Sequence, residues 1–149
     1  MKKIITAIGN EILNNNLKKE ADIQVIMNDI QYKEGIIEVL EENSEIDIII
    51  CNNLLQGEIT IKELINKINL INPKIKIIVI LEKNNNDLEK YLYSKGVFKV
   101  IYNNQIEIKD LIKIINNNDE TSEELKEEIK NLKNIILENQ NKIKIKNEL

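Results

Sequence analysis

The sequence predicts an α/β fold: a flavodoxin-like (βα)5 doubly wound parallel sheet with strand order 2-1-3-4-5, followed by a C-terminal amphipathic helix. Two observations lead to this prediction. Five short apolar runs alternate with segments whose apolar residues recur every three to four positions. Two of these runs, 46–51 and 74–81, are almost continuously apolar, which is typical of central parallel strands covered on both faces. Right-handed crossovers between such strands place helices on both faces of one sheet.

The strands are the five apolar runs, taken in chain order. They are expected at residues 3–8, 22–27, 46–51, 74–81 and 97–102. The first two helices are indicated by apolar stripes that should face the sheet. These stripes are Ile12, Leu13 and Leu17 in the first helix, and Ile36, Ile37, Val39 and Leu40 in the second.

The last three helices of the sheet domain carry stop or start signals as well as stripes. Thr60 and Glu63 have the spacing of a capping box, and the third helix should end before Pro73. Asn86 or Asp87 is expected to cap the fourth helix, and Gly96 is suited to the left-handed residue that follows its end. The apolar positions of the third and fifth helices are Leu64, Ile65 and Ile68, and Ile108, Leu111, Ile112 and Ile115.

A second segment, residues 119–149, follows the sheet domain of residues 1–118. Thr121 and Glu124 form another capping box, and a helix is expected from there to about Glu138. Its apolar residues follow the 4-3-4 spacing of a helix-pairing seam: Leu125, Ile129, Leu132 and Ile136. Two interpretations stay open. The helix pairs two copies of the chain as a short coiled coil, or it packs on the sheet domain as a sixth helix.

Composition excludes several classes of function. The chain has 149 residues, no His, Arg or Trp, and a net charge of −4, so it lacks an imidazole base and the positive charge of nucleic-acid binders. Its one cysteine, Cys51, closes an apolar run and is expected to be a buried structural thiol. No apolar run has the length of a membrane span, and the start does not read as a signal peptide. A cytoplasmic protein without a membrane or nucleic-acid partner is expected.

The stretch IDIIICNNLLQG, residues 46–57, carries a family resemblance together with the order of the elements. Residues 1–118 resemble the receiver domain of two-component response regulators. In that family an aspartate at the end of the third strand accepts phosphate, beside an acidic pair that holds magnesium, a Ser or Thr, a Lys and an aromatic switch residue. The positions that match these are, in this sequence, Asn52, Gly9-Asn10, Leu81, Asn103-Asn104 and Val100.

The resemblance therefore implies a receiver without its chemistry. Phosphoryl transfer needs an anionic oxygen nucleophile and a divalent cation, and neutral amides such as those of Asn10 and Asn52 supply neither. The rim of the strand tips is expected to be too neutral to seat a cation and a phosphoryl group together. The chain looks like a non-catalytic pseudo-receiver, a protein-interaction and regulatory module. Similar pseudo-receivers precede MinD/ParA-like P-loop ATPases, so such an ATPase is an adjoining partner that the resemblance implies.

A small ligand or ion at the carboxyl ends of the strands is the alternative function. Glu11, Asp29 and Glu82 are expected just past strand ends, and with the Asn10 and Asn52 carbonyls they offer oxygen ligands for a hard cation. Solvated loop charges are the competing interpretation, and no metal site is predicted. The turn IGNEIL has one glycine, and neither a Walker loop nor a GxGxxG element occurs, so no cofactor is predicted either.

The aromatic residues gather in one stretch of the sequence. Aromatics make up 3% of the chain, and four of the five lie in the expected fourth helix and fifth strand: Tyr91, Tyr93, Phe98 and Tyr102. Tyrosine is favoured at interfaces because it gives a large contact area with a polar tip. These residues are a candidate interaction face. The alternative is that Tyr91 and Phe98 fill the core while Tyr93 and Tyr102 are solvated.

Overall fold

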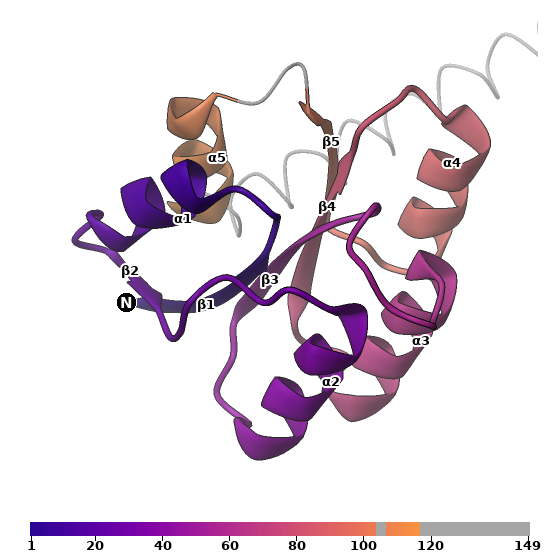
Figure 1. Cartoon of the computed structure of the whole chain (residues 1–149), viewed down its shortest axis with the longest axis horizontal. Helices are drawn as coiled ribbons and strands as arrows, with labels where there is room; N and C mark the ends of the chain where they lie inside the picture. Colours follow the sequence, from indigo (N-terminus) through magenta and orange to yellow (C-terminus); the bar gives the residue numbers. More distant parts are fainter. Residues whose placement is uncertain (104–106, 117–149) are drawn as a thin grey trace, which may run out of the picture. The chain divides into compact units, whose positions relative to one another are not determined.

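The structure of the chain is a computed structural model that describes residues 1–103 and 107–116. Within these residues, five parallel strands form one sheet in the order β2-β1-β3-β4-β5 and alternate with helices (Figure 1). The predicted fold class and strand order are confirmed. The elements are β1 Lys2–Ala7, α1 Glu11–Lys18, β2 Ile23–Val25, α2 Lys33–Glu42, β3 Ile48–Asn52, α3 Ile61–Ile71, β4 Lys76–Leu81, α4 Asn86–Ser94, β5 Lys99–Tyr102 and α5 Ile108–Asn116.

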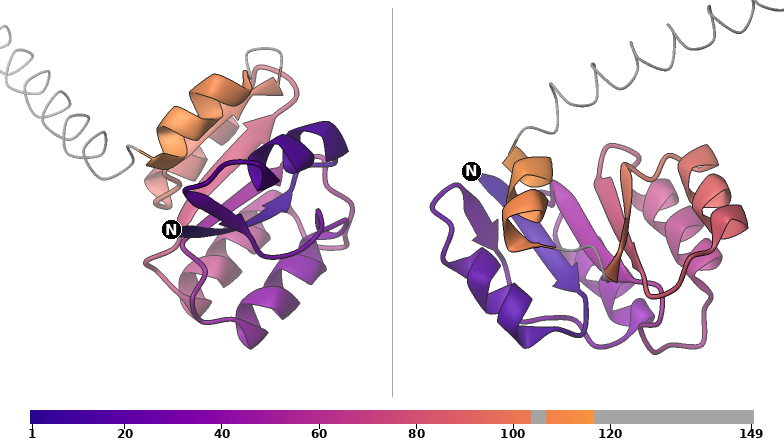
Figure 2. Two further views of the ribbon diagram at one scale, coloured as in Figure 1. Left: turned by 90° about the vertical axis from the view of Figure 1, so that its left-hand side faces the viewer. Right: turned by 90° about the horizontal axis from the view of Figure 1, so that it is seen from above.

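Helices cover both faces of the sheet, which explains why β3 and β4 are apolar at nearly every position. Alternate residues of β1, β3 and β4, such as Ile5, Ile49 and Val79, share one buried cluster with residues of α2, α3 and α4. The opposite face meets α1, where the buried Asn14 side chain donates to the buried Thr6 hydroxyl at 2.5 Å. Figure 2 shows α1 on one side of the sheet and α2 with α3 on the other.

Several helix ends lie where local sequence signals place them. The Thr60 hydroxyl accepts a hydrogen bond from the Glu63 amide, and α3 ends before Pro73. Gly96 has φ +87°, and the amides of Gly96 and Val97 donate to carbonyls of the last turn of α4. This pair of bonds is a Schellman motif, in which a left-handed residue closes the helix end.

Three expectations about helix starts and stripes are wrong. The cap of α4 is Asn85, whose side chain accepts from the Leu88 amide, rather than Asn86 or Asp87. Glu11 is the first residue of α1 and not part of a loop. Ile12 is 76% exposed although Leu13 and Leu17 are buried, because a helix that starts at Glu11 turns Ile12 away from the sheet.

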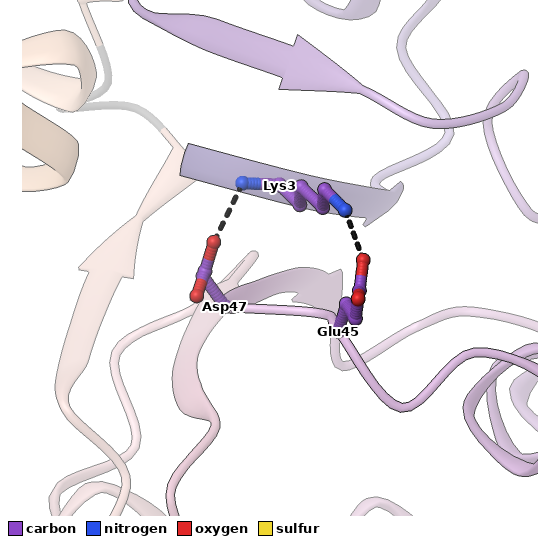
Figure 3. A network of polar contacts seen from close by, with 3 residues as sticks. All are labelled: Lys3, Glu45 and Asp47. Atoms are coloured by element: carbon purple, nitrogen blue, oxygen red, sulfur yellow. Dashed lines mark hydrogen bonds and ion pairs between the residues drawn. The ribbon is translucent and has the colours of Figure 1, made fainter. Parts of the chain in front are cut away.

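The amino ends of β1 and β3 are joined by polar contacts of one lysine (Figure 3). The Lys3 backbone amide donates to Asp47 Oδ2 at 2.8 Å, and its ammonium pairs with the Glu45 carboxylate. That ion pair lowers the pKa of Glu45, because the ammonium hydrogen-bonds to the ionised carboxylate. A pocket of about 200 Å³ opens here, at the end of the sheet opposite the tips where β1, β3 and β4 finish. Its lining residues are Lys3, Ile26, Glu42, Asn43, Ser44, Glu45 and Ile46.

The helix expected at 121–138 and the boundary expected after residue 118 lie outside the described residues. The same is true of the helix-pairing seam at Leu125, Ile129, Leu132 and Ile136. None of the helices in the described part of the chain combines the length and the apolar character needed to cross a membrane.

Candidate functional site

The positions that match the receiver motif gather at the carboxyl edge of the sheet. Gly9 and Asn10 follow β1, Asn52 ends β3, Leu81 ends β4 and Asn103 follows β5. Because β1, β3, β4 and β5 are consecutive neighbours in a parallel sheet, their ends meet along one edge. Asn52 lies level with Ile80 in the β3–β4 register, which brings it next to the residue that follows β4, Glu82.

Glu82 is the centre of the polar contacts at this edge. Its Oε1 accepts a hydrogen bond from Asn52 Nδ2 at 2.7 Å, and its Oε2 accepts one from Asn103 Nδ2 at 2.9 Å. One carboxylate thus joins the tips of β3, β4 and β5, and we call these three side chains the Glu82 bridge. Asn52 and Glu82 are half-buried and Asn103 is exposed. The expectation of a neutral rim is therefore incomplete, because the bridge places one carboxylate between the two amides.

The other end of the Asn52 amide is also occupied. Its Oδ1 accepts from the Leu54 backbone amide at 2.9 Å, which closes a tight turn directly after β3. The side chain is therefore fixed at both ends, by the turn on one side and by Glu82 on the other. An amide held in this way is neither an anionic nucleophile nor an anionic metal ligand.

The turn after β1 is built from local hydrogen bonds. Asn10 caps α1, since its Oδ1 accepts from the Leu13 amide at 3.1 Å. The Asp29 carboxylate accepts from the Ile8 amide at 2.9 Å and the Gly9 amide at 2.8 Å, so it holds the turn from the β2–α2 side. Gly9 has φ +68°, a left-handed conformation that suits glycine.

The hydrogen bonds at the strand tips argue against the cation site that the sequence leaves as an alternative. The oxygens of Asn10, Asp29, Asn52 and Glu82 accept hydrogen bonds from the protein itself, and Glu11 lies in the first turn of α1. Magnesium favours hard carboxylate oxygens in near-ideal octahedral geometry. The residues do not fit it, because Gly9 has no side chain and Asn10 offers one neutral carbonyl that already caps a helix. In residues 1–103 and 107–116 no three His, Cys, Asp or Glu side chains form a cluster that could hold a metal ion.

Two further positions of the receiver motif are occupied by core residues. Leu81 is 1% exposed and Val100 is 5% exposed, and both belong to the cluster that α2, α3 and α4 cover. Leu81 supplies no hydroxyl at the end of β4, and Val100 supplies no aromatic ring in β5. Their side chains contribute apolar packing at these two positions.

Cys51 is the buried structural thiol that the sequence predicts. It is fully buried in β3, and burial raises its pKa to about 12. The nearby Lys33 ammonium opposes this rise without overcoming it. Since the thiolate is the nucleophilic form, the thiol is unreactive at neutral pH.

The aromatic residues of α4 and β5 mostly contact their own domain. The Tyr93 hydroxyl accepts from the Val100 backbone amide at 3.1 Å, and the Tyr102 hydroxyl donates to Glu89 Oε2 at 2.5 Å. Both contacts tie α4 to the edge strand β5. Burial raises the pKa of Tyr93, and the hydrogen bond to the Glu89 carboxylate raises the pKa of Tyr102.

Tyr91 and Phe98 lie beneath lysine side chains. The Lys62 ammonium is 4.5 Å from the centre of the Tyr91 ring, and the Lys95 ammonium is 5.8 Å from it. Lys76 lies 5.2 Å from the Phe98 ring centre. Of the four aromatic residues, Tyr93 is the most exposed, at 42%. The candidate interaction face is therefore not a continuous aromatic surface. It presents mainly the exposed Tyr93 ring and the lysine side chains that lie over Tyr91.

The position of Glu82 near the strand tips follows from the sequence, but its role does not. Glu82 is expected from the sequence to be a solvated loop charge or, in the alternative, an oxygen ligand for a cation, whereas the structure makes it the acceptor for Asn52 and Asn103. The signal was present: each of the three residues ends or follows one of three strands that the predicted order makes neighbours. Polar residues at such positions are expected to contact one another.

Comparison with known proteins identifies a fold. No protein-family model and no curated protein sequence matches the chain. Solved structures do. A response regulator receiver domain protein from Clostridium thermocellum has a TM-score of 0.67 at 18% identity, covering 84% of this chain and 99% of that one. A CheY-like receiver domain protein from Methanospirillum hungatei has 0.66 at 15% identity, covering 83% and 98%.

A third solved structure agrees with these two. A LuxR-family DNA-binding response regulator from Staphylococcus aureus has a TM-score of 0.66 at 18% identity, covering 78% of this chain and 97% of that one. At such identities the likeness concerns the backbone and not the site. The five-stranded sheet described above is thus the fold of response-regulator receiver domains.

Proposed function

We propose that this chain is a non-catalytic receiver-like module that acts through protein–protein interaction and is not phosphorylated by aspartate chemistry. The receiver fold supports a signalling or regulatory role. The Glu82 bridge is the observation that carries the rest of the proposal. The residue at the phosphate-accepting position, Asn52, is an amide that donates to a carboxylate, so it has neither the charge nor the freedom of a nucleophile.

The same bridge disfavours a bound phosphoryl group. A phosphoryl group at the end of β3 would approach the Glu82 carboxylate, which accepts from two neutral donors and has no cation among them. Like charges about 4 Å apart repel by roughly 4 kcal/mol at the effective dielectric constant near a protein surface. The loss of the nucleophile and the presence of the carboxylate therefore act in the same direction.

A beryllofluoride titration tests this part of the proposal. Beryllofluoride with magnesium mimics a phosphorylated aspartate, and amide chemical shifts of the full chain report its binding. We expect no saturable shifts at Asn52, Leu54 or Asn103. Specific saturable shifts at these three residues would refute the proposal and favour a working switch.

The partner side of the proposal rests on one described surface and on one segment known from its sequence alone. The α4–β5 face presents Tyr93 and the lysines around Tyr91, and tyrosine is enriched in interfaces. The segment 121–138 carries the seam described from the sequence, and we propose that it pairs two copies of the chain or joins a further domain. A MinD/ParA-like P-loop ATPase is our proposed partner of the second kind.

Light scattering tests the pairing. A dimer is expected for the full chain, and Leu132→Asp or Ile136→Asp should shift it to a monomer because a carboxylate cannot be buried in an apolar seam. Asn134→Asp adds the same charge away from the seam and is the matched control. A monomer for the unmodified chain, or equal effects of Leu132→Asp and Asn134→Asp, would contradict the pairing.

A further inference from the structure

The segment between β3 and α3 is attached to the amino end of α2. The Lys33 backbone amide donates to the Gln56 carbonyl at 2.8 Å, and Tyr32 forms an isolated parallel bridge with Gln56. These two backbone contacts lie outside the sheet and join the loop after β2 directly to the loop after β3. The segment that leaves Asn52 runs beside the start of α2 rather than freely over the surface.

The Lys33 side chain adds a buried contact to the same segment. Lys33 is 8% exposed, and its ammonium donates to the Leu55 carbonyl at 2.6 Å. A buried ammonium is costly unless its hydrogen bonds are satisfied. Moving Leu55 away would remove this acceptor while the charge remained buried, so the contact resists displacement of the segment.

The Glu34 carboxylate holds the next part of the segment. Its Oε1 accepts from the Glu58 amide at 2.6 Å and from the Ile59 amide at 3.1 Å. Hydrogen bonds from its own backbone amide and from those two amides lower the pKa of Glu34, so the carboxylate is ionised at neutral pH. Charge-assisted bonds of this kind are stronger than bonds between neutral groups.

Gly57 makes the close approach feasible. It has φ +148°, a conformation that side chains rarely adopt, and a Cβ added there would lie 2.6 Å from Glu34 Oε2. The sequence thus provides a residue without a side chain at the point where the carboxylate meets the backbone. The fit between Gly57 and Glu34 is specific to this conformation of the segment.

We propose that Lys33 and Glu34 form a latch, the α2 latch, that holds residues 54–59 in one conformation and couples the tip of β3 to α2. The Asn52 side chain accepts from the Leu54 amide, Lys33 holds the carbonyls of Leu55 and Gln56, and Glu34 holds the amides of Glu58 and Ile59, so contacts link the tip of β3 to α2 along this segment. A partner that displaces this segment must also move the start of α2. The latch is independent of whether Asn52 can accept a phosphoryl group.

Amide hydrogen exchange of the full chain tests the latch. In the unmodified protein the Glu58 and Ile59 amides should be protected. Glu34→Ala should speed their exchange by about tenfold to a hundredfold, the range expected when a hydrogen bond to a charged group is lost. Glu38→Ala, an exposed position on the same helix, is the matched control and should leave both rates unchanged. Amides of Ile49 and Ile50 in β3 report global unfolding and should change only as far as overall stability does.

Gly57→Ala perturbs the loop side of the same contact and leaves Lys33 and Glu34 unchanged. It should also release the Glu58 and Ile59 amides selectively, because the new Cβ meets the Glu34 carboxylate. Three outcomes would overturn the proposal. These are unprotected Glu58 and Ile59 amides in the unmodified protein, equal rates in Glu34→Ala and Glu38→Ala, or one common acceleration of the β3 and loop amides in both latch variants.

Discussion

Replacing Asn52 by aspartate removes the donor from the Glu82 bridge and adds a second carboxylate in its place. Asn52 Nδ2 lies 2.7 Å from Glu82 Oε1, so the variant brings two carboxylate oxygens to that separation. Two unit charges centred about 4 Å apart repel by roughly 4 kcal/mol at an effective dielectric constant of about 20, and water around these half-buried groups reduces this to about 2 kcal/mol. Loss of the hydrogen bond adds about 1 kcal/mol.

Asn52→Asp should therefore lower the free energy of unfolding by about 3 kcal/mol at pH 7, or Tm by roughly 12 °C for a domain of this size. Urea and thermal unfolding measure this. Asn53→Asp makes the same change one residue along and is the matched control, with a loss near zero. The difference between the two variants should shrink as pH falls, because repulsion raises the pKa of the carboxyl pair and one proton then restores a donor.

The result that refutes this reasoning is equal stability of Asn52→Asp and Asn53→Asp at pH 7. A double variant, Asn52→Asp with Glu82→Gln, gives a second check, since it returns one donor and one carboxylate and should recover most of the loss. Phosphorylation provides a third check. Treatment of Asn52→Asp with acetyl phosphate and magnesium should leave its mass unchanged, because the residues after β1 still offer no carboxylate pair.

Three further predictions concern the core and the edge of the sheet. The unfolded chain releases the Cys51 proton above the ordinary pKa of 9.0, whereas the folded protein keeps it. Between pH 8 and pH 10 the free energy of unfolding should therefore fall by about 1.4 kcal/mol more in the unmodified protein than in Cys51→Ala, as measured by urea unfolding. Tyr93→Phe removes the acceptor of a β5 amide and should cost about 1 kcal/mol, whereas Tyr32→Phe on an exposed ring should cost nothing measurable. Thr6→Val removes the acceptor of the buried Asn14 amide and should cost about 1–3 kcal/mol, most of it recovered in Thr6→Val with Asn14→Leu.

The parts of the fold that could be predicted from the sequence depend on backbone preferences and periodicity. The apolar runs of β3 and β4, the cap at Thr60 and the left-handed Gly96 are local signals that tertiary packing reinforces. The start of α4 was harder because Asn84, Asn85 and Asn86 are chemically alike, and the cap is decided by where the helix axis meets the sheet. The same limit explains Ile12, whose exposure depends on the first residue of α1.

The position of the candidate site could be predicted from the sequence, but the contacts among its side chains could not. Spacing placed Asn52, Leu81 and Asn103 at strand ends, and the structure confirms those ends. The contacts among them depend on strand twist and side-chain rotamers, which periodicity does not encode. The α2 latch was missed for a related reason. Nothing in the sequence around Lys33 and Glu34 indicates that these two residues bind a loop more than twenty residues away.

Charge at the strand tips places a stronger constraint on function than the missing nucleophile does. An aspartate placed at residue 52 would supply an anionic oxygen, yet it would also raise the negative charge beside Glu82, which already accepts from Asn52 and Asn103 without a cation. A phosphoryl group transferred to that aspartate would still lie beside the Glu82 carboxylate. Phosphoryl transfer at residue 52 would require the charge of Glu82 to be balanced and a cation site to be built after β1. Because these changes lie on different strands and each alone leaves the charge unbalanced, we expect no single substitution at residue 52 to create a phosphorylation site.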